Sequence, residues 1–229
     1  MTTGPQKISA TTVREQVYQQ LRSLVIQGHF SQDYRFDLNQ LSKDLGVSRT
    51  PLGAAIQQLK NEGLLVVKPR SGTFLNKLNE VDVREAFELR KILELGAVHL
   101  VLDKITDEDV ARIESLNDEI KSLLAREDYQ NQVEKIISLD KQIHDGFINA
   151  SQHKLLIETY GRINTLLLVF RARRKFRIAD SQRTIVEHDT IISALRGRDP
   201  TQIQAAIKLH LDGALERLLN TNTIARKGE

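Results

Sequence analysis

The sequence predicts a mainly α-helical fold, in which a small N-terminal module of helices and one β-hairpin precedes a larger all-α bundle. Apolar residues recur at the spacing of amphipathic helices through most of the chain, and the connections between helical segments are short. Two β-prone pieces are confined to one segment after Gly63. A chain of 229 residues is long enough for two domains, and the pattern changes near Asn79. We therefore expect domains over residues 1–78 and 79–229.

The N-terminal module is expected to contain three helices followed by a hairpin. The first helix covers residues 11–27, and the second lies between an Asp37 N-cap and Gly46. Ser48 can cap the third helix, because the residues after it place apolar side chains on one face. The stretch LLVVKPRSGTFLNKL then predicts a β-hairpin with a basic tip. This order is typical of a winged helix-turn-helix, and a small generic helical domain is the alternative.

The second domain is expected to be a bundle of six or seven helices, because no strand signal remains after Asn79. Thr106 followed by Glu108 and Asp109 predicts one helix start, and Asp199–Pro200 predicts another. The expected helices lie near residues 80–102, 106–126, 131–151, 154–174, 181–197 and 200–219.

Charge is distributed unevenly between these two parts. Residues 1–79 hold 10 Lys and Arg against 5 Asp and Glu, whereas the rest of the chain holds 23 against 25. A basic module beside a near-neutral body favours a polyanion as partner of the first part. The absence of cysteine excludes disulfides and thiol chemistry, and no apolar run is long enough to span a bilayer. We expect a cytoplasmic protein that has no membrane partner.

Double-stranded DNA is the polyanion that the N-terminal pattern favours. The N-terminus of the third helix would enter the major groove, where Arg49 can bind a guanine edge or a phosphate. Thr50 can contact a phosphate or a thymine methyl, and the helix N-terminus itself favours a phosphate. The candidate DNA-binding residues are therefore Ser48, Arg49 and Thr50 on this helix and Arg70, Ser71 and Gly72 at the hairpin tip.

The segment LSKDLGVSRTPLGAAIQQLKNEGLLVVKPRSGTFL resembles the DNA-binding domain of GntR-type bacterial transcription regulators. The resemblance spans roughly residues 13–76, and GVSRTP followed by EGLL and the P-x-x-G hairpin is its specific part. The family usually has Arg-Glu where this chain has Gly53 and Ala54, and that arginine commonly contacts DNA. The resemblance therefore implies an operator-binding head in which one common contact is missing.

Four polar residues occur on the apolar stripes of the second domain. Asp140 and His144 share one helix face, His188 lies on the apolar stripe of the next-to-last helix, and His210 lies on that of the last. A buried carboxylate without a partner is very costly, and a divalent metal bound by one carboxylate and three imidazoles would account for all four. Zn, Ni, Mn and Fe all suit these ligands. A hydrogen-bonded polar core or a carboxylate–histidinium pair is the alternative.

The spacing of these residues resembles the FCD ligand-sensing domain of one large GntR branch. Asp140-x-x-x-His144, the segment EHDTIISALRGRD with His188, and the later His210 carry the resemblance, with Ile143 in place of the usual Phe. The family pattern implies a metal held by the Asp and three His, with positions open for water or an organic acid.

The segment VREAFELRKILE also resembles the first FCD helix. The resemblance implies that Arg90 faces the cavity and grips an effector carboxylate, and an ion pair with Glu94 at i+4 is the alternative. A second group of arginines is expected to form a solvated basic face, with an inward-pointing Arg173 as the alternative. The group consists of Arg171, Arg173, Arg174 and Arg177.

Together these features predict a homodimeric, metal-containing repressor that reads a near-palindromic operator and responds to a small organic acid. A metal-dependent hydrolase or lyase with a DNA-binding appendage is one alternative, although no inward carboxylate is placed to act as its general base. A regulator with a purely structural metal is the other.

Overall fold

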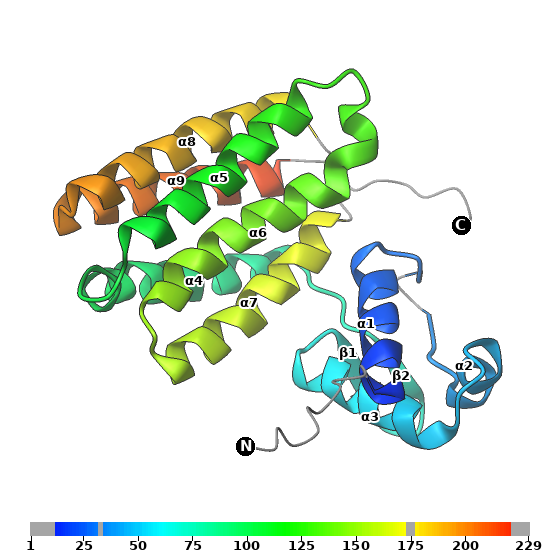
Figure 1. The fold of residues 1–229 in the computed structure, drawn as a ribbon. Coiled ribbons are helices and arrows are strands. Elements are labelled where there is room, and N and C mark those ends of the chain that lie inside the picture. The colour runs from blue at the N-terminus through cyan, green and yellow to red at the C-terminus, as the bar shows by residue number, and fades with distance from the viewer. Residues whose placement is uncertain (1–11, 32–33, 173–176, 221–229) are drawn as a thin grey trace, which may run out of the picture. The chain divides into compact units, whose positions relative to one another are not determined.

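The computed structural model describes residues 12–31, 34–172 and 177–220. It divides the chain into two compact units, Met1–Lys77 and Leu78–Glu229 (Figure 1). The first contains three helices and a two-stranded sheet, and every further helix of the described residues belongs to the second. The predicted mainly α fold, with a winged helix-turn-helix and an all-helical C-terminal unit, is confirmed.

The first unit packs three helices around a small apolar core. Leu21 and Val25 of the first helix pack with Leu52 and Leu59 of the third, and all four side chains are completely buried. Asp37 caps the second helix, because its carboxylate accepts hydrogen bonds from two backbone N–H groups of the first turn. The three helices are α1 (Val13–Ile26), α2 (Leu38–Asp44) and α3 (Arg49–Asn61).

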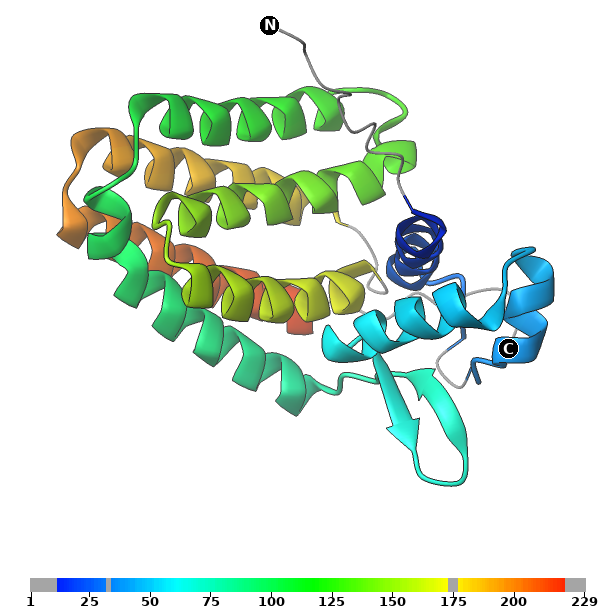
Figure 2. The ribbon, with the colours of Figure 1, turned by 60° about the horizontal axis from the view of Figure 1, so that its bottom comes forward.

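The wing is an antiparallel hairpin of β1 (Leu65–Lys68) and β2 (Gly72–Leu75) that follows α3 (Figure 2). The segment before α2 also pairs with β2, because Phe36 N donates to Thr73 O at 2.9 Å. Gly72 has φ +122°, and a Cβ there would lie 2.8 Å from Nε of Arg35. The left-handed backbone therefore favours glycine at this position, whereas the flexible Arg35 side chain could move away from a Cβ.

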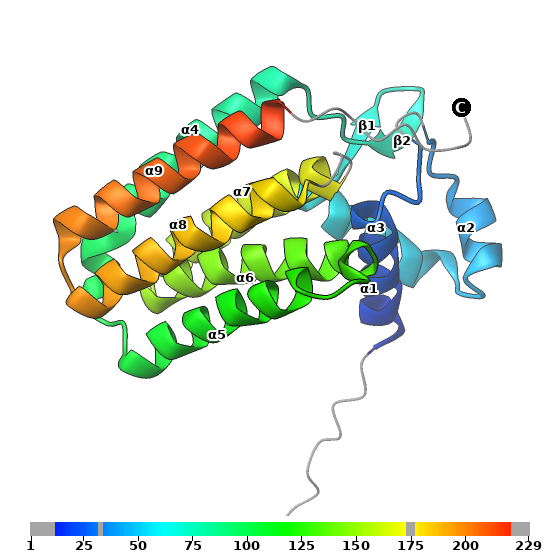
Figure 3. The ribbon, with the colours of Figure 1, turned by 90° about the horizontal axis from the view of Figure 1, so that it is seen from above.

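The second unit is a bundle of six long helices among the described residues. Figure 3 shows their nearly common direction, with α4 beside α9 and α5 beside α6. Reciprocal capping boxes begin α4 at Asn79 and α5 at Thr106. The helices are α4 (Glu80–Leu102), α5 (Asp107–Leu124), α6 (Val133–Ala150), α7 (Lys154–Ala172), α8 (Ile178–Gly197) and α9 (Pro200–Leu219). A short 3-10 helix (Tyr129–Gln132) precedes α6, so the helix predicted near residue 131 begins slightly later.

One apolar core runs through this bundle and includes residues from all six helices. The same unit buries ten polar or charged side chains, and such side chains are seldom fully buried unless they are hydrogen-bonded or paired. Of the helices that the structure describes, none combines the length and apolarity needed to cross a bilayer.

Candidate functional site

The N-terminus of α3 presents the predicted recognition residues to solvent. Ser48, Arg49 and Thr50 are all exposed. Ser48 has the extended backbone of an N-cap residue, but its side chain makes no capping hydrogen bond, which corrects the expected capping role. The first-turn N–H groups of α3 therefore lack a capping side chain, and such groups bind anions well.

The wing tip carries the other predicted DNA-binding residues. Arg70 is exposed and adopts a left-handed backbone with φ 61°, and Ser71 beside it is exposed as well. Gly72 is half-buried, and its conformation lets Arg35 lie across the wing. The DNA contacts of these residues and of the α3 residues stay predictions.

Gly53 lies in the second turn of α3, and a Cβ built on it would meet no atom within 4 Å. Gly53→Ala should raise the free energy of unfolding of the first unit by about 1 kcal/mol, because alanine has the higher helix propensity. Gly53→Arg should in addition bind the operator roughly tenfold more tightly and steepen the salt dependence by about one phosphate contact. Titrations of labelled operator at several salt concentrations measure this. Equal operator affinity for the two variants would refute the hypothesis that an arginine at position 53 contacts the operator.

Three buried imidazoles meet in the interior of the bundle, one each from α6, α8 and α9. His144, His188 and His210 are at most 3% exposed, and one nitrogen from each lies within 4.8 Å of the others. The Nε2 atoms of His144 and His210 are 3.0 Å apart. The predicted convergence of these histidines is therefore present in the fold.

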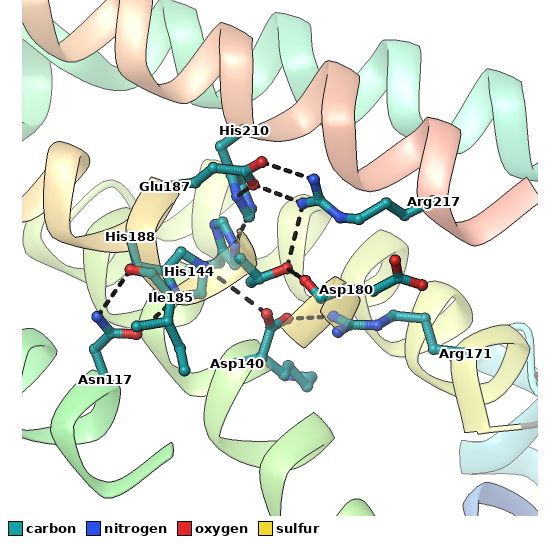
Figure 4. A network of polar contacts seen from close by, with 12 residues as sticks. Asn117, Asp140, His144, Arg171, Asp180, Ile185, Glu187, His188, His210 and Arg217 are labelled. Carbon is teal, nitrogen blue, oxygen red and sulfur yellow. Dashed lines mark hydrogen bonds and ion pairs between the residues drawn. The ribbon is translucent and has the colours of Figure 1, made fainter. Parts of the chain in front are cut away.

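Each of these histidines is anchored at Nδ1 by an acceptor from a second helix, and Figure 4 labels Asn117 and Glu187, the anchors of His188 and His210. The three anchors are Glu94 Oε2 for His144 at 3.3 Å, Asn117 Oδ1 for His188 at 3.2 Å and Glu187 Oε2 for His210 at 2.9 Å. An imidazole that donates through Nδ1 keeps the lone pair of Nε2 for another partner. The three Nε2 lone pairs are thereby directed into one small volume.

This arrangement fits a cation better than it fits a closed hydrogen-bond network. Burial lowers the pKa of His210 to about 4, and burial also lowers the pKa of His188 well below its usual value, so both rings are neutral near pH 7. Nε2 of His188 is buried without a hydrogen-bond partner. The two nitrogens at 3.0 Å have no proton to share when both rings carry theirs on Nδ1. The donor set therefore suits a divalent transition metal.

Asp140 lies beside this cluster and divides its two oxygens between two partners. Oδ1 is 3.8 Å from Nε2 of His188, and Oδ2 accepts a hydrogen bond from Nη1 of Arg171. Burial by itself raises the pKa of Asp140, but Arg171 and then His188 and His144 reverse the effect and hold it well below its usual range. Asp140 is thus an ionised carboxylate at the edge of the imidazole cluster.

The expectation of a solvated basic face at the end of α7 is wrong for Arg171. Its side chain points into the bundle and is only 30% exposed, because Asp140 attracts it there. Arg177 is exposed and pairs with Asp180 at 3.7 Å. Arg173 and Arg174 lie outside the described residues.

Arg90 forms the expected ion pair with Glu94 and also faces the cavity, whereas its binding of an effector stays a prediction. Its Nε donates to Glu94 Oε1 at 2.6 Å, which is the i+4 ion pair. Its Nη2 is buried without a hydrogen-bond partner, and the side chain lines the cavity described below. Glu94 also accepts a hydrogen bond from Tyr160 at 2.7 Å and, as noted above, anchors His144. A ligand held by Arg90 would therefore be connected to the imidazole cluster through one shared carboxylate.

A cavity of about 100 Å³ lies next to these groups, and all of its walls come from the second unit. Its polar wall includes Arg90, Asp140, His188 and His210. The apolar wall consists of Phe87, Ile120, Ile136, Ile137, Ile185, Ala214 and Leu218. An apolar chamber with a few converging polar groups is the usual form of a small-molecule site.

The sequence patterns did not identify the residues that anchor the site. Asn117 could have been found, because it lies three residues before Ile120 and four after Ile113 on the apolar face of α5. The partners of the other anchors depend on how neighbouring helices align, which no periodicity reports. Glu94 was expected only as the ion-pair partner of Arg90, and Arg171 only as part of a basic face. The residues not assigned to the site are Asn117, Tyr160, Glu187 and Arg217.

Comparison with known proteins defines the class first. The FCD domain matches residues 85–213, more than half of the chain, and the bacterial regulatory proteins of the gntR family match residues 8–75. The chain therefore belongs to the GntR-family transcriptional regulators that carry an FCD domain. It is a transcriptional regulator with a DNA-binding domain and a ligand-binding domain, and not an enzyme.

Individual relatives agree with this assignment. The HTH-type transcriptional regulator YdhC of Bacillus subtilis is 26% identical over 89% of this chain and 89% of its own length. LutR of the same organism, also an HTH-type transcriptional regulator, is 29% identical over 75% of this chain and 84% of its own. Among solved structures, McbR/YncC of Escherichia coli superposes with a TM-score of 0.76 at 19% identity, covering 92% of this chain and 98% of its own, which supports the fold.

The anchoring residues provide a direct test of the predicted metal site. Glu187→Gln should weaken zinc binding roughly 10- to 100-fold, because the amide can present its NH2 group to His210 and it leaves Arg217 without its carboxylate. Competition against a chelating dye measures the affinity. Glu216→Gln, which changes an exposed acid on α9, is the matched control and should bind zinc as the unaltered protein does. Equal affinities for the two variants would argue against an anchoring role.

Proposed function

We propose that this chain is a ligand-responsive transcriptional repressor that binds its operator as a homodimer in the cytoplasm. Two α3 helices, one from each subunit, would read half-sites of a near-palindrome. A small organic acid entering the cavity of the second unit would favour one arrangement of the domains. Only a difference in affinity between arrangements can shift their equilibrium, so the ligand must bind the DNA-incompetent arrangement more tightly.

The observation that carries this proposal is the pairing of two unsatisfied features at one cavity. Three Nδ1-anchored imidazoles direct their Nε2 atoms inward, and Nη2 of Arg90 lies buried without a hydrogen-bond partner. His144, His188 and His210 together with Asp140 would hold a divalent transition metal such as Zn, Ni, Mn or Fe. When bound, that metal would supply Lewis acidity that attracts an anionic ligand. Arg90 would orient a carboxylate through its planar fork of donors.

Elemental analysis of purified protein, followed by a thermal-shift screen of small carboxylates and by operator titrations, tests the proposal. We expect about one metal ion per chain, stabilisation by at least one class of acid, and weaker operator binding in its presence. Chelation that melts the bundle, combined with acids that leave operator affinity unchanged, would support a purely structural metal and refute the sensor.

A further inference from the structure

Among the described residues, the fixed charges at the cavity of the second unit balance once the acidic partners behind its wall, Glu94 and Glu187, are counted with those that line it. Four arginines line it, and each has an acidic partner of its own. The pairs are Arg90 with Glu94, Arg171 with Asp140, Arg177 with Asp180 and Arg217 with Glu187. Two histidines also line the wall, and imidazoles that ligate a metal are neutral. The protein groups around the cavity therefore sum to no net charge.

A divalent ion at the imidazole cluster would leave this neutral surrounding with two uncompensated positive charges. Unbalanced charge in a low-dielectric interior is costly, and a bound anion of matching charge removes the imbalance. A monocarboxylate would neutralise only half of it. The balance favours a ligand with two negative charges.

The cationic side chains are distributed from the floor of the cavity to its mouth. The side chain of Arg90 is 3% exposed, that of Arg217 13%, that of Arg171 30% and that of Arg177 54%. Arg171 makes its ion pair with Asp140 through Nη1, and a guanidinium carries five N–H donors in all. Donors are thus present at the buried and at the exposed part of the chamber, and the rest of the lining mixes apolar side chains with Asp140, Ser181, Thr184, His188 and His210. Two separated anionic groups on a short carbon chain match this distribution better than one compact dianionic group.

We propose that the effector is a dicarboxylate, with one carboxylate at the floor near Arg90 and the other toward Arg171 at the mouth. This inference rests on the proposed function, because the two uncompensated charges come from the metal. It goes beyond that function by fixing the charge and the two-ended form of the ligand.

The test compares each diacid with its own half-amide, which has nearly the same shape but one charge fewer. Malonate, succinate and glutarate, each with its half-amide, should be titrated calorimetrically into zinc-loaded protein whose metal content has been verified. We expect at least one diacid to bind about tenfold or more tightly than its half-amide, since one extra charge a few ångströms from cationic groups has an effect of that order. Metal-free protein should show a much smaller preference.

Ser181 offers a way to change the charge of the cavity without touching the predicted metal ligands or Arg90. It is half-buried and lines the wall near the first turn of α8. Ser181→Asp adds one negative charge, so the preference for the diacid over its half-amide should fall by about tenfold. Ser181→Asn introduces a side chain of the same shape as Asp but without the charge, and it should keep the preference.

The outcomes separate the two proposals. Diacids and half-amides that bind equally to zinc-loaded protein would overturn the dicarboxylate, and the organic-acid sensor would stand. A phosphate monoester such as methyl phosphate that binds more tightly than every diacid would also overturn it, in favour of one compact dianionic group. Failure of every acid to bind would instead refute the proposed function.

Discussion

Replacing His188 and His210 together with alanine should leave the purified protein without stoichiometric metal. Both side chains are at most 1% exposed, and both contribute nitrogens to the imidazole cluster, so the double variant retains one imidazole and one carboxylate there. Two ligands bind a transition metal far more weakly than four, and the loss should be complete after dialysis. Elemental analysis of the dialysed protein measures it.

The alanine variants remove two buried rings and could destabilise the bundle, so a second variant is needed. Replacing both histidines with glutamine keeps most of the volume and a polar end, and it should likewise abolish metal binding while circular dichroism shows a folded bundle. His99→Ala is the matched control, because His99 is exposed on α4 and should leave the metal content unchanged. Metal retained by a folded double variant would defeat the assignment of these ligands.

The periodic signal explains why the inward position of the four proposed ligands could be predicted from the sequence. Asp140 and His144 are four residues apart on a helix whose other inward residues are apolar, so one helix is enough to place both in the interior. The same argument places His188 and His210 on the buried faces of their own helices. Whether a segment forms a helix, and which of its side chains face inward, depends on the residues of that segment alone. Both can therefore be read from the sequence.

The burial of Asn117 can be read from its helix face, but the contacts of the anchors could not be predicted, because each contact depends on the relative alignment of two helices. Arg217 reaches Glu187 across the α8–α9 contact, and a Cβ on Gly213 would lie 2.9 Å from Nη1 of Arg217. The glycine therefore makes room for a contact between residues thirty positions apart. Arg171 was misassigned for the same reason, since its partner Asp140 lies on another helix. Side-chain packing sets such alignments, and no pattern within one helix reports them.

Arg49→Ala should abolish specific operator binding. Arg49 is exposed at the N-terminus of α3, where the predicted geometry directs it to a base edge. Loss of one bidentate base contact removes roughly 1–3 kcal/mol, and the proposed homodimer loses it in both half-sites. The combined loss is comparable with the roughly 4–10 kcal/mol that separate specific from non-specific binding. Titration of labelled operator against a scrambled duplex measures the difference.

Arg49→Lys distinguishes the two contacts that this residue can make. A lysine keeps the charge but not the planar fork, so it should retain much of a phosphate contact and little of a bidentate guanine contact. Arg112→Ala, at an exposed arginine of the second unit, controls for the loss of one positive charge and should leave operator binding intact. Unchanged operator affinity in Arg49→Ala would mean that another element of the head reads the DNA. If lysine restores binding while alanine abolishes it, Arg49 positions the head on the backbone, and sequence is read by its neighbours on α3 and the wing.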